Sequence, residues 1–113
     1  IMNTESLPIC EKNTSIKDVI IEISKGQQGA VFVCESKKLL WVFTDGDLRR
    51  CIESGIRITT KIKNLKYSIP LSIKSGSKVS IALKKMQSHK ISILPVVDTM
   101  GILLGSVKLS QCI

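Results

Sequence analysis

The chain carries the same pattern of apolar and polar positions twice. Residues 13–34 read NTSIKDVIIEISKGQQGAVFVC, and residues 76–97 read GSKVSIALKKMQSHKISILPVV. In both segments apolar residues recur at spacings of three and four, which places them along one face of a helix. The corresponding positions are Ile16, Val19, Ile20 and Ile23 in the first segment and Val79, Ala82, Leu83 and Met86 in the second. The pattern therefore predicts two related helices, one in each half of the chain.

Hydroxyl residues precede both predicted helices, Thr14 and Ser15 in the first half and Ser77 in the second. We expect them to be N-caps, because their side chains can accept a hydrogen bond from the first turn. Short apolar strands follow the helices, and each leads through a polar turn to a second strand, as in a hairpin. The predicted strands are 30–34, 40–44, 93–97 and 103–107. Continuous apolar strands of this kind are typical of strands buried on both faces.

Extended segments that begin at Pro8 and Pro70 precede the helices, so each half has the order strand–helix–strand–strand. The first half adds a helix from about Asp45 to Glu53, and the connection between the halves predicts one helical turn near 61–65. One half alone would leave a sheet face open, so the two should pack into a single pseudo-twofold α/β unit. The predicted divisions are repeat 1 at 1–55, a linker at 56–68 and repeat 2 at 69–113.

Composition adds limits to this picture. A chain of 113 residues with 43% apolar residues predicts one ordered unit. No apolar run approaches the roughly 20 residues of a membrane helix, so we expect a soluble chain. The start at Ile1 carries no secretory signal pattern and indicates a fragment of a longer protein.

The four cysteines and the one histidine, His89, do not form the close pairs that zinc sites use, so we expect no metal site. Cys10 and Cys34 lie within apolar runs, which predicts reduced and buried thiols. A cytoplasmic location is the simplest consequence.

The charge is strongly positive, because 17 Lys and Arg residues outnumber 9 Asp and Glu residues to give +8. Such a charge suggests nucleic acid. However, the lysines are spread along the chain, and 4% aromatic residues leave few platforms for stacking bases. The charge then reflects solvated lysine faces, or a field that attracts a small phosphorylated ligand.

The sequence FTDGDLRRC lies where the second predicted strand passes into a helix. Thr44 and Asp47 have the spacing of a capping box, which needs no ligand. The same two residues could also bind a ligand. The N–H groups at a helix start attract phosphate, and a carboxylate can accept hydrogen bonds from the hydroxyls of a ribose. Gly46 would allow a close backbone turn, and Arg49 and Arg50 could each hold a phosphate or carboxylate through two hydrogen bonds. Spacing alone leaves both interpretations open.

The repeat order, ILPVVD at 93–98 and FTDGDLRR at 43–50 resemble a tandem pair of CBS domains, also called a Bateman module. FTDGDLRR and the opening IMNTESLPI are similar to the CBS pair behind the sugar-isomerase domain of bacterial arabinose-5-phosphate isomerases. Those enzymes serve the synthesis of Kdo, an acidic sugar of lipopolysaccharides and capsules. Some CBS-bearing sugar-phosphate nucleotidyltransferases carry a similar string and are an alternative parent.

The resemblance implies that catalysis belongs to an upstream sugar-isomerase domain, so this fragment should bind or regulate and not catalyse. Thr44 and Asp47 would contact the ligand, which could be AMP, ATP, CMP or CMP-Kdo. The other repeat would contribute further contacts, for which the candidates are Ser72, Lys74, Ile91, Ser92 and Leu94. His89 is a further candidate, although a histidine at a helix end is also a common C-terminal cap. Two such modules are expected to pair face to face as a homodimer.

The sequence departs from the family pattern at several places. Lys108 and Gln111 correspond to Thr44 and Asp47, so the equivalent second site should be weak or lost. Lys108 could supply a counter-charge there or be an ordinary solvated lysine. Trp41 stands where the family often has glycine, and it could fill part of the pocket or pack at a dimer face. The resemblance implies a helix that closes repeat two, and we expect that helix to be missing because the sequence stops at Ile113. A purely structural role, in which the pair dimerises without a ligand, is therefore a second hypothesis.

Overall fold

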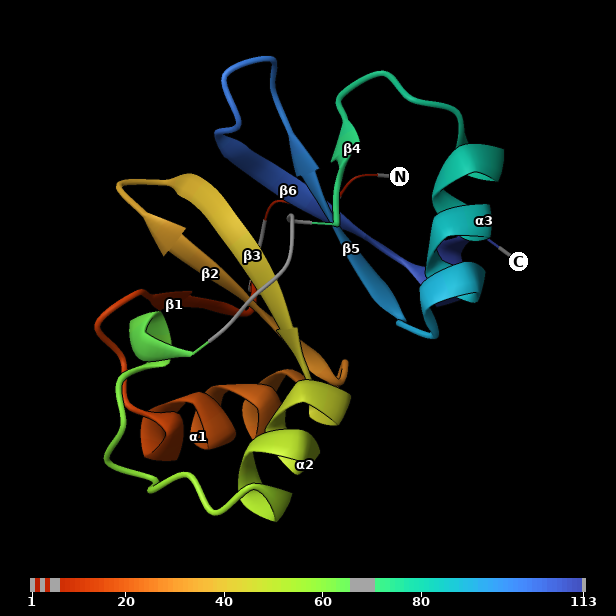
Figure 1. Cartoon of the computed structure of the whole chain (residues 1–113). Coiled ribbons are helices and arrows are strands. Elements are labelled where there is room, and N and C mark those ends of the chain that lie inside the picture. The colour runs from red at the N-terminus through yellow and green to blue at the C-terminus, as the bar shows by residue number, and fades with distance from the viewer. Residues whose placement is uncertain (1, 3, 5–6, 66–70, 113) are drawn as a thin grey trace.

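Two three-stranded sheets form the centre of the molecule, one from each half of the chain (Figure 1). The computed structural model describes residues 2, 4, 7–65 and 71–112. The first sheet contains β1 (Ile9–Glu11), β2 (Ala30–Glu35) and β3 (Lys38–Thr44). The second sheet contains β4 (Ile73–Lys74), β5 (Ile93–Val97) and β6 (Leu103–Lys108). In both sheets the first strand is parallel to the middle strand and the third is antiparallel to it, which confirms the predicted hairpins and repeat.

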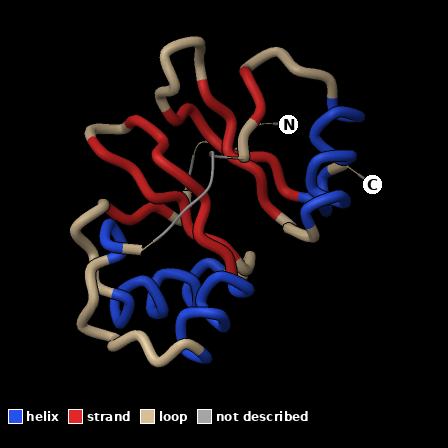
Figure 2. Tube along the Cα trace, in the orientation of Figure 1, coloured by secondary structure: helices blue, strands red, loops and turns tan. Residues whose placement is uncertain are grey.

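The helices lie on the outer sides of the two sheets (Figures 1 and 2). Helices α1 (Ile16–Gly26) and α2 (Asp45–Glu53) cover the first sheet, and α3 (Val79–His89) covers the second. Short 3-10 turns occur at η1 (Ile62–Asn64) and η2 (Leu109–Gln111). No helix in the described ranges has the length and apolar character needed to cross a membrane.

The predicted N-cap of the first helix is confirmed, and that of the α3 helix is wrong. Ser15 Oγ accepts a hydrogen bond from the Asp18 N–H at 3.3 Å. Helix α3 instead follows Lys78, whose side chain makes no capping hydrogen bond. Ser77 lies one residue too early, because its N–H donates to the Lys74 carbonyl at 3.1 Å in the turn that leaves β4.

The two sheets pack against each other through a shared apolar core. Alternate residues of β2 separate its two faces, because Val31 and Val33 face α1 and α2 whereas Phe32 belongs to the layer between the sheets. That layer consists of Ala30, Phe32, Cys34, Leu39, Ile93 and Val97. β2 and β5 are therefore buried on both faces, as their continuous apolar sequences predict.

The hairpin tips of the two sheets also bind each other. The Leu39 N–H donates to the Gly101 carbonyl at 3.0 Å, and the Leu103 N–H donates to the Lys37 carbonyl at 2.8 Å. The two sheets are therefore joined by backbone hydrogen bonds as well as by the shared core.

Much of the predicted linker packs on the first half. Ile62 is fully buried in the core beneath α1, and its N–H donates to the Thr14 carbonyl at 2.8 Å. The Ile16 N–H, at the start of α1, donates to the Thr60 carbonyl at 2.9 Å. Physically, the segment around η1 belongs to repeat 1. Residues 66–68 of the predicted linker, and Pro70, lie outside the described residues, so the predicted domain boundaries stay predictions.

Candidate ligand-binding cleft

A cleft of about 780 Å³ lies between the two halves. One wall is the start of α2 with the loop before β2, and the other is the end of α3 with the loop before β5. The predicted site residues on the cleft are Thr44, Gly46, Arg49, Arg50, Ile91 and Ser92. The volume lies within the range of about 300–1,000 Å³ that is typical of small-molecule sites.

Cationic side chains dominate the charged residues of this cleft. Arg49 and Arg50 extend from α2, and Lys90 follows α3, whereas Asp45 contributes a carboxylate. Clefts lined mainly by one sign of charge concentrate ligands of the opposite sign. The cleft is therefore suited to an anion.

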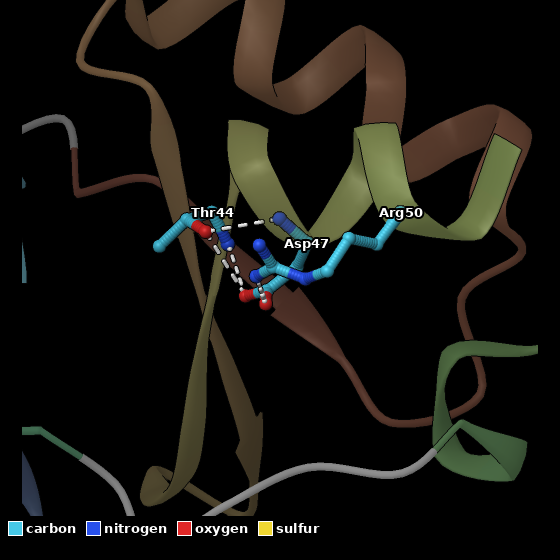
Figure 3. A network of polar contacts seen from close by, with 3 residues as sticks. All are labelled: Thr44, Asp47 and Arg50. Carbon is cyan, nitrogen blue, oxygen red and sulfur yellow. Dashed lines mark hydrogen bonds and ion pairs between the residues drawn. The ribbon is translucent and has the colours of Figure 1, made fainter. Parts of the chain in front are cut away.

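Thr44, Asp47 and Arg50 form a local polar network at the start of α2 (Figure 3). Asp47 Oδ2 accepts hydrogen bonds from the Thr44 N–H at 2.9 Å and from the Thr44 hydroxyl at 3.0 Å. The Asp47 N–H in turn donates to Thr44 Oγ1 at 3.2 Å, which confirms the predicted capping box. Arg50 Nη2 donates to Asp47 Oδ1 at 2.5 Å. Asp47 thus has partners within its own helix turn.

Asp47 also lines a smaller hollow of about 160 Å³ that includes residues of both halves. Its other lining residues are Trp41, Val42, Thr44, Leu71, His89 and Ile91. Thr44, His89 and Ile91 line the larger cleft as well, so the two hollows adjoin. Asp47 therefore lies beside the cleft that the two halves share.

Trp41 lies in the first core and forms part of the wall of this hollow. Its side chain is only 4% exposed. Of the two predicted positions, the structure favours the one in which Trp41 fills space beside the pocket. Its indole narrows the hollow next to Asp47.

The remaining candidates of the second repeat are divided between the cleft and other surroundings. Ser92 Oγ donates to the Gln28 carbonyl at 2.7 Å, which ties the halves together at the cleft. Ser72 and Lys74 do not line the cleft, and the Ser72 carbonyl accepts a hydrogen bond from Lys85 Nζ at 2.8 Å. Leu94 is fully buried in the core beneath α3, so its side chain cannot reach a ligand without opening that core.

The close backbone turn predicted at Gly46 is wrong, although the residue lines the cleft. Gly46 lies in the first turn of α2 and lacks the positive φ that favours glycine. A Cβ there would be 3.5 Å from Arg50 Nη1 and 3.6 Å from Thr44 Oγ1, which are ordinary contacts. No close backbone turn requires glycine at this position.

His89 contacts the end of its own helix, and its contact with a ligand stays a prediction. It is the last residue of α3, and its Nδ1 lies 3.0 Å from the Lys85 carbonyl oxygen. Since a carbonyl only accepts, Nδ1 carries a hydrogen in this contact. The ring also lines both hollows.

Sequence reasoning missed one pair of loops that form the cleft, at 27–29 and around Lys90. The internal repeat contained the signal, because Gln27 corresponds to Lys90 and Gly29 corresponds to Ser92. Loops in corresponding positions of a pseudo-twofold unit can face each other across the axis. The alignment of the repeats could therefore have identified them.

The second repeat reproduces the cap with different chemistry. The Lys108 N–H donates to Gln111 Oε1 at 3.0 Å, just as the Thr44 N–H donates to Asp47. Lys108 also lines a hollow of about 320 Å³ that includes Lys25 and Ser106. The equivalent of Asp47 there is an uncharged amide.

Within the described ranges, no group of three or more His, Cys, Asp or Glu side chains could hold a metal ion.

Comparisons with known proteins agree with this architecture. The family model of the CBS domain matches residues 63–113. A CBS domain protein from Pyrobaculum aerophilum, solved as a complex with AMP, superposes with a TM-score of 0.80 at 19% identity, covering 98% of this chain and 89% of that one. At that identity the likeness establishes the fold.

Several curated relatives are arabinose 5-phosphate isomerases. GutQ from Escherichia coli O6:H1 is 33% identical over 108 residues, which are 95% of this chain and 34% of GutQ. KdsD from Francisella tularensis subsp. tularensis is 35% identical over 108 residues, which are 95% of this chain and 33% of KdsD. The chain thus spans about a third of the length of the curated relatives it matches.

The chain has the fold of a tandem pair of CBS domains, which confirms the predicted fold, and its residues 63–113 match the CBS domain itself. It is related to the matching third of arabinose 5-phosphate isomerases.

Proposed function

We propose that this CBS pair is a regulatory module that binds a nucleotide or nucleotide-activated sugar in the cleft between its repeats. Its parent would be an arabinose-5-phosphate isomerase of Kdo synthesis, with the catalytic sugar-isomerase domain upstream. The free cysteines fit a cytoplasmic enzyme. The module would regulate by binding its ligand with different affinity in two states of the enzyme.

The observation that carries this proposal is the shape and charge of the cleft. Arg49, Arg50 and Lys90 line the larger cleft, where phosphates would bind, and the adjoining hollow has the Asp47 carboxylate on its wall. A ligand with a sugar diol beside Asp47 and a phosphate toward the arginines would use both parts. The AMP in the Pyrobaculum aerophilum relative supports a nucleotide.

Calorimetry of the chain with AMP, ATP, CMP and CMP-Kdo tests the proposal directly. Trp41 provides a second readout, since it is the only tryptophan and lies on the wall of the hollow. Binding should give heat and a change in Trp41 emission, and both should weaken in the Asp47→Ala protein. Absence of both signals at millimolar ligand would reject nucleotide binding.

A structural role without a ligand is the second candidate. The observation in its favour is that the cap and Arg50 already engage both oxygens of the Asp47 carboxylate. In that case the chain should form dimers in analytical ultracentrifugation, while calorimetry with all four ligands stays silent. The ligand hypothesis predicts binding heat whether or not the chain dimerises.

The identity of the parent is tested on the full-length protein. Arabinose 5-phosphate isomerase activity that changes on addition of the ligand bound by the fragment would support the proposal. In the Asp47→Ala protein the same change should require a ligand concentration about 10- to 150-fold higher, because the variant weakens binding by that factor. Nucleotidyltransferase activity in place of isomerase activity would support the alternative parent.

A further inference from the structure

Arg50 lies between two possible partners, the Asp47 carboxylate and an anion in the cleft. We propose that this position makes Arg50 a specificity residue, which favours phosphorylated ligands over the corresponding nucleosides. The inference rests on the proposed function, because it concerns the ligand of that same cleft.

The hydrogen-bonding capacity of Asp47 is the first reason. An ionised carboxylate has about four acceptor positions. Thr44 takes two of them on Oδ2, and Arg50 takes one on Oδ1. At most one position is then left, whereas the vicinal hydroxyls of a ribose donate two hydrogen bonds. A sugar can therefore engage Asp47 fully only when Arg50 moves away.

The exposure of the ion pair is the second reason. The Arg50 side chain is 69% exposed and that of Asp47 is 36% exposed. Pairs of this kind contribute about 0.2–1 kcal/mol, which corresponds to about a 1.5- to 5-fold effect on an equilibrium. Arg50 can thus leave Asp47 easily, but the exchange still reduces the affinity of a ligand that offers nothing in return.

A phosphate offers that return at the place where Arg50 already lies. Arg50 lines the cleft, and its Nη1 lies 3.5 Å from the position that a Cβ on Gly46 would occupy, over the first turn of α2. A guanidinium binds phosphate through two charge-assisted hydrogen bonds. A nucleotide would therefore draw Arg50 from Asp47 and expose the acceptor that its own sugar needs. A nucleoside competes with Arg50 for that acceptor without compensation.

Titrations of the wild-type and Arg50→Gln proteins with AMP and adenosine, and with CMP and cytidine, test this inference. Arg50→Gln should weaken nucleotide binding by about 10-fold or more, the effect of a lost charged hydrogen bond. The same change should strengthen nucleoside binding by about 1.5- to 5-fold, because Asp47 gains a free acceptor.

Two matched variants separate this effect from general charge. Arg49→Gln removes a cleft cation that has no contact with Asp47 among those described, so it should weaken nucleotides without strengthening nucleosides. Arg57→Gln makes the same charge change outside the cleft. It should change both affinities only by the weak, salt-screened effect of one surface charge.

Inorganic phosphate gives an independent measurement. Millimolar phosphate should raise nucleoside affinity in the wild-type protein by occupying Arg50, and it should have no such effect in the Arg50→Gln protein. If nucleotides still bind but nucleoside affinity is unmeasurable, unchanged or reduced in the Arg50→Gln protein, the inference is overturned. If the wild-type protein binds none of these nucleotides or nucleosides, the proposed function itself is overturned.

Discussion

Asp47→Ala separates the structural role of the capping box from its proposed role in binding. The variant loses the hydrogen bonds to the Thr44 N–H and hydroxyl and the ion pair with Arg50. A lost cap costs about 0.5–2 kcal/mol, and an exposed ion pair adds about 0.2–1 kcal/mol. We therefore expect the free energy of unfolding to fall by about 0.7–3 kcal/mol, measured by urea denaturation.

The same variant should lose affinity for a nucleotide in the cleft. Hydrogen bonds to a charged group contribute about 1.5–3 kcal/mol, so the dissociation constant should rise about 10- to 150-fold. Calorimetry at a temperature well below the unfolding transition measures this change on folded protein. Asp47→Asn should fall between the wild type and Asp47→Ala, because the amide oxygen keeps an acceptor for Thr44 but loses the charge.

Ser15→Ala is the matched control, since it removes a helix cap outside the cleft. Ser15 caps α1 through the Asp18 N–H at 3.3 Å, so its loss should lower stability by about 0.5–2 kcal/mol. Ligand affinity should not change in this variant. Equal affinities in the Asp47→Ala and Ser15→Ala proteins would refute the binding role of Asp47. An Asp47→Ala protein as stable as the wild type would refute the capping argument.

Three further predictions concern the fold. Ile62→Ala should lower the free energy of unfolding by about 2–5 kcal/mol because Ile62 is fully buried, whereas Ile58→Ala, at a side chain 50% exposed, should change it by less than about 0.5 kcal/mol. Similar small losses would mean that the segment around η1 is not part of the first core. Burial raises the pKa of Cys10 to about 12 and that of Cys34 to about 11 from an ordinary 9.0, so the unfolded chain releases these protons at lower pH than the folded protein. The free energy of unfolding should therefore fall as pH rises above 9, by up to about 1.4 kcal/mol per thiol and pH unit. The urea midpoint of a variant with alanine at both Cys10 and Cys34 should fall less steeply with pH than that of the wild type. If the urea midpoints of both proteins fall equally with pH, the buried thiols are not the cause of the loss of stability. Ser92→Ala removes a hydrogen bond of 2.7 Å across the halves and should cost about 0.5–1.5 kcal/mol, which Ser92→Thr should partly restore; an unchanged urea midpoint for Ser92→Ala would count against it.

The features that the sequence determined by itself are local ones. The predicted helix from Asp45 to Glu53 has the observed bounds of α2, and the Thr44–Asp47 cap forms as predicted. Both depend on contacts between residues three or four positions apart, which spacing specifies directly. The repeat was visible for the same reason, since each half carries its own periodicity and its own apolar strands.

Tertiary packing decided which residues face the cleft. Ile91 and Leu94 are close in sequence, yet Ile91 lines the cleft and Leu94 lies in a core. The difference arises because the buried strand β5 begins between them, at Ile93. Ile62 was assigned to a linker but is buried beneath α1. In each case the exposure of a side chain depends on the layer that covers it, and that layer comes from a distant part of the chain. Local spacing does not carry this information, whereas the packing of two repeats about a shared core does.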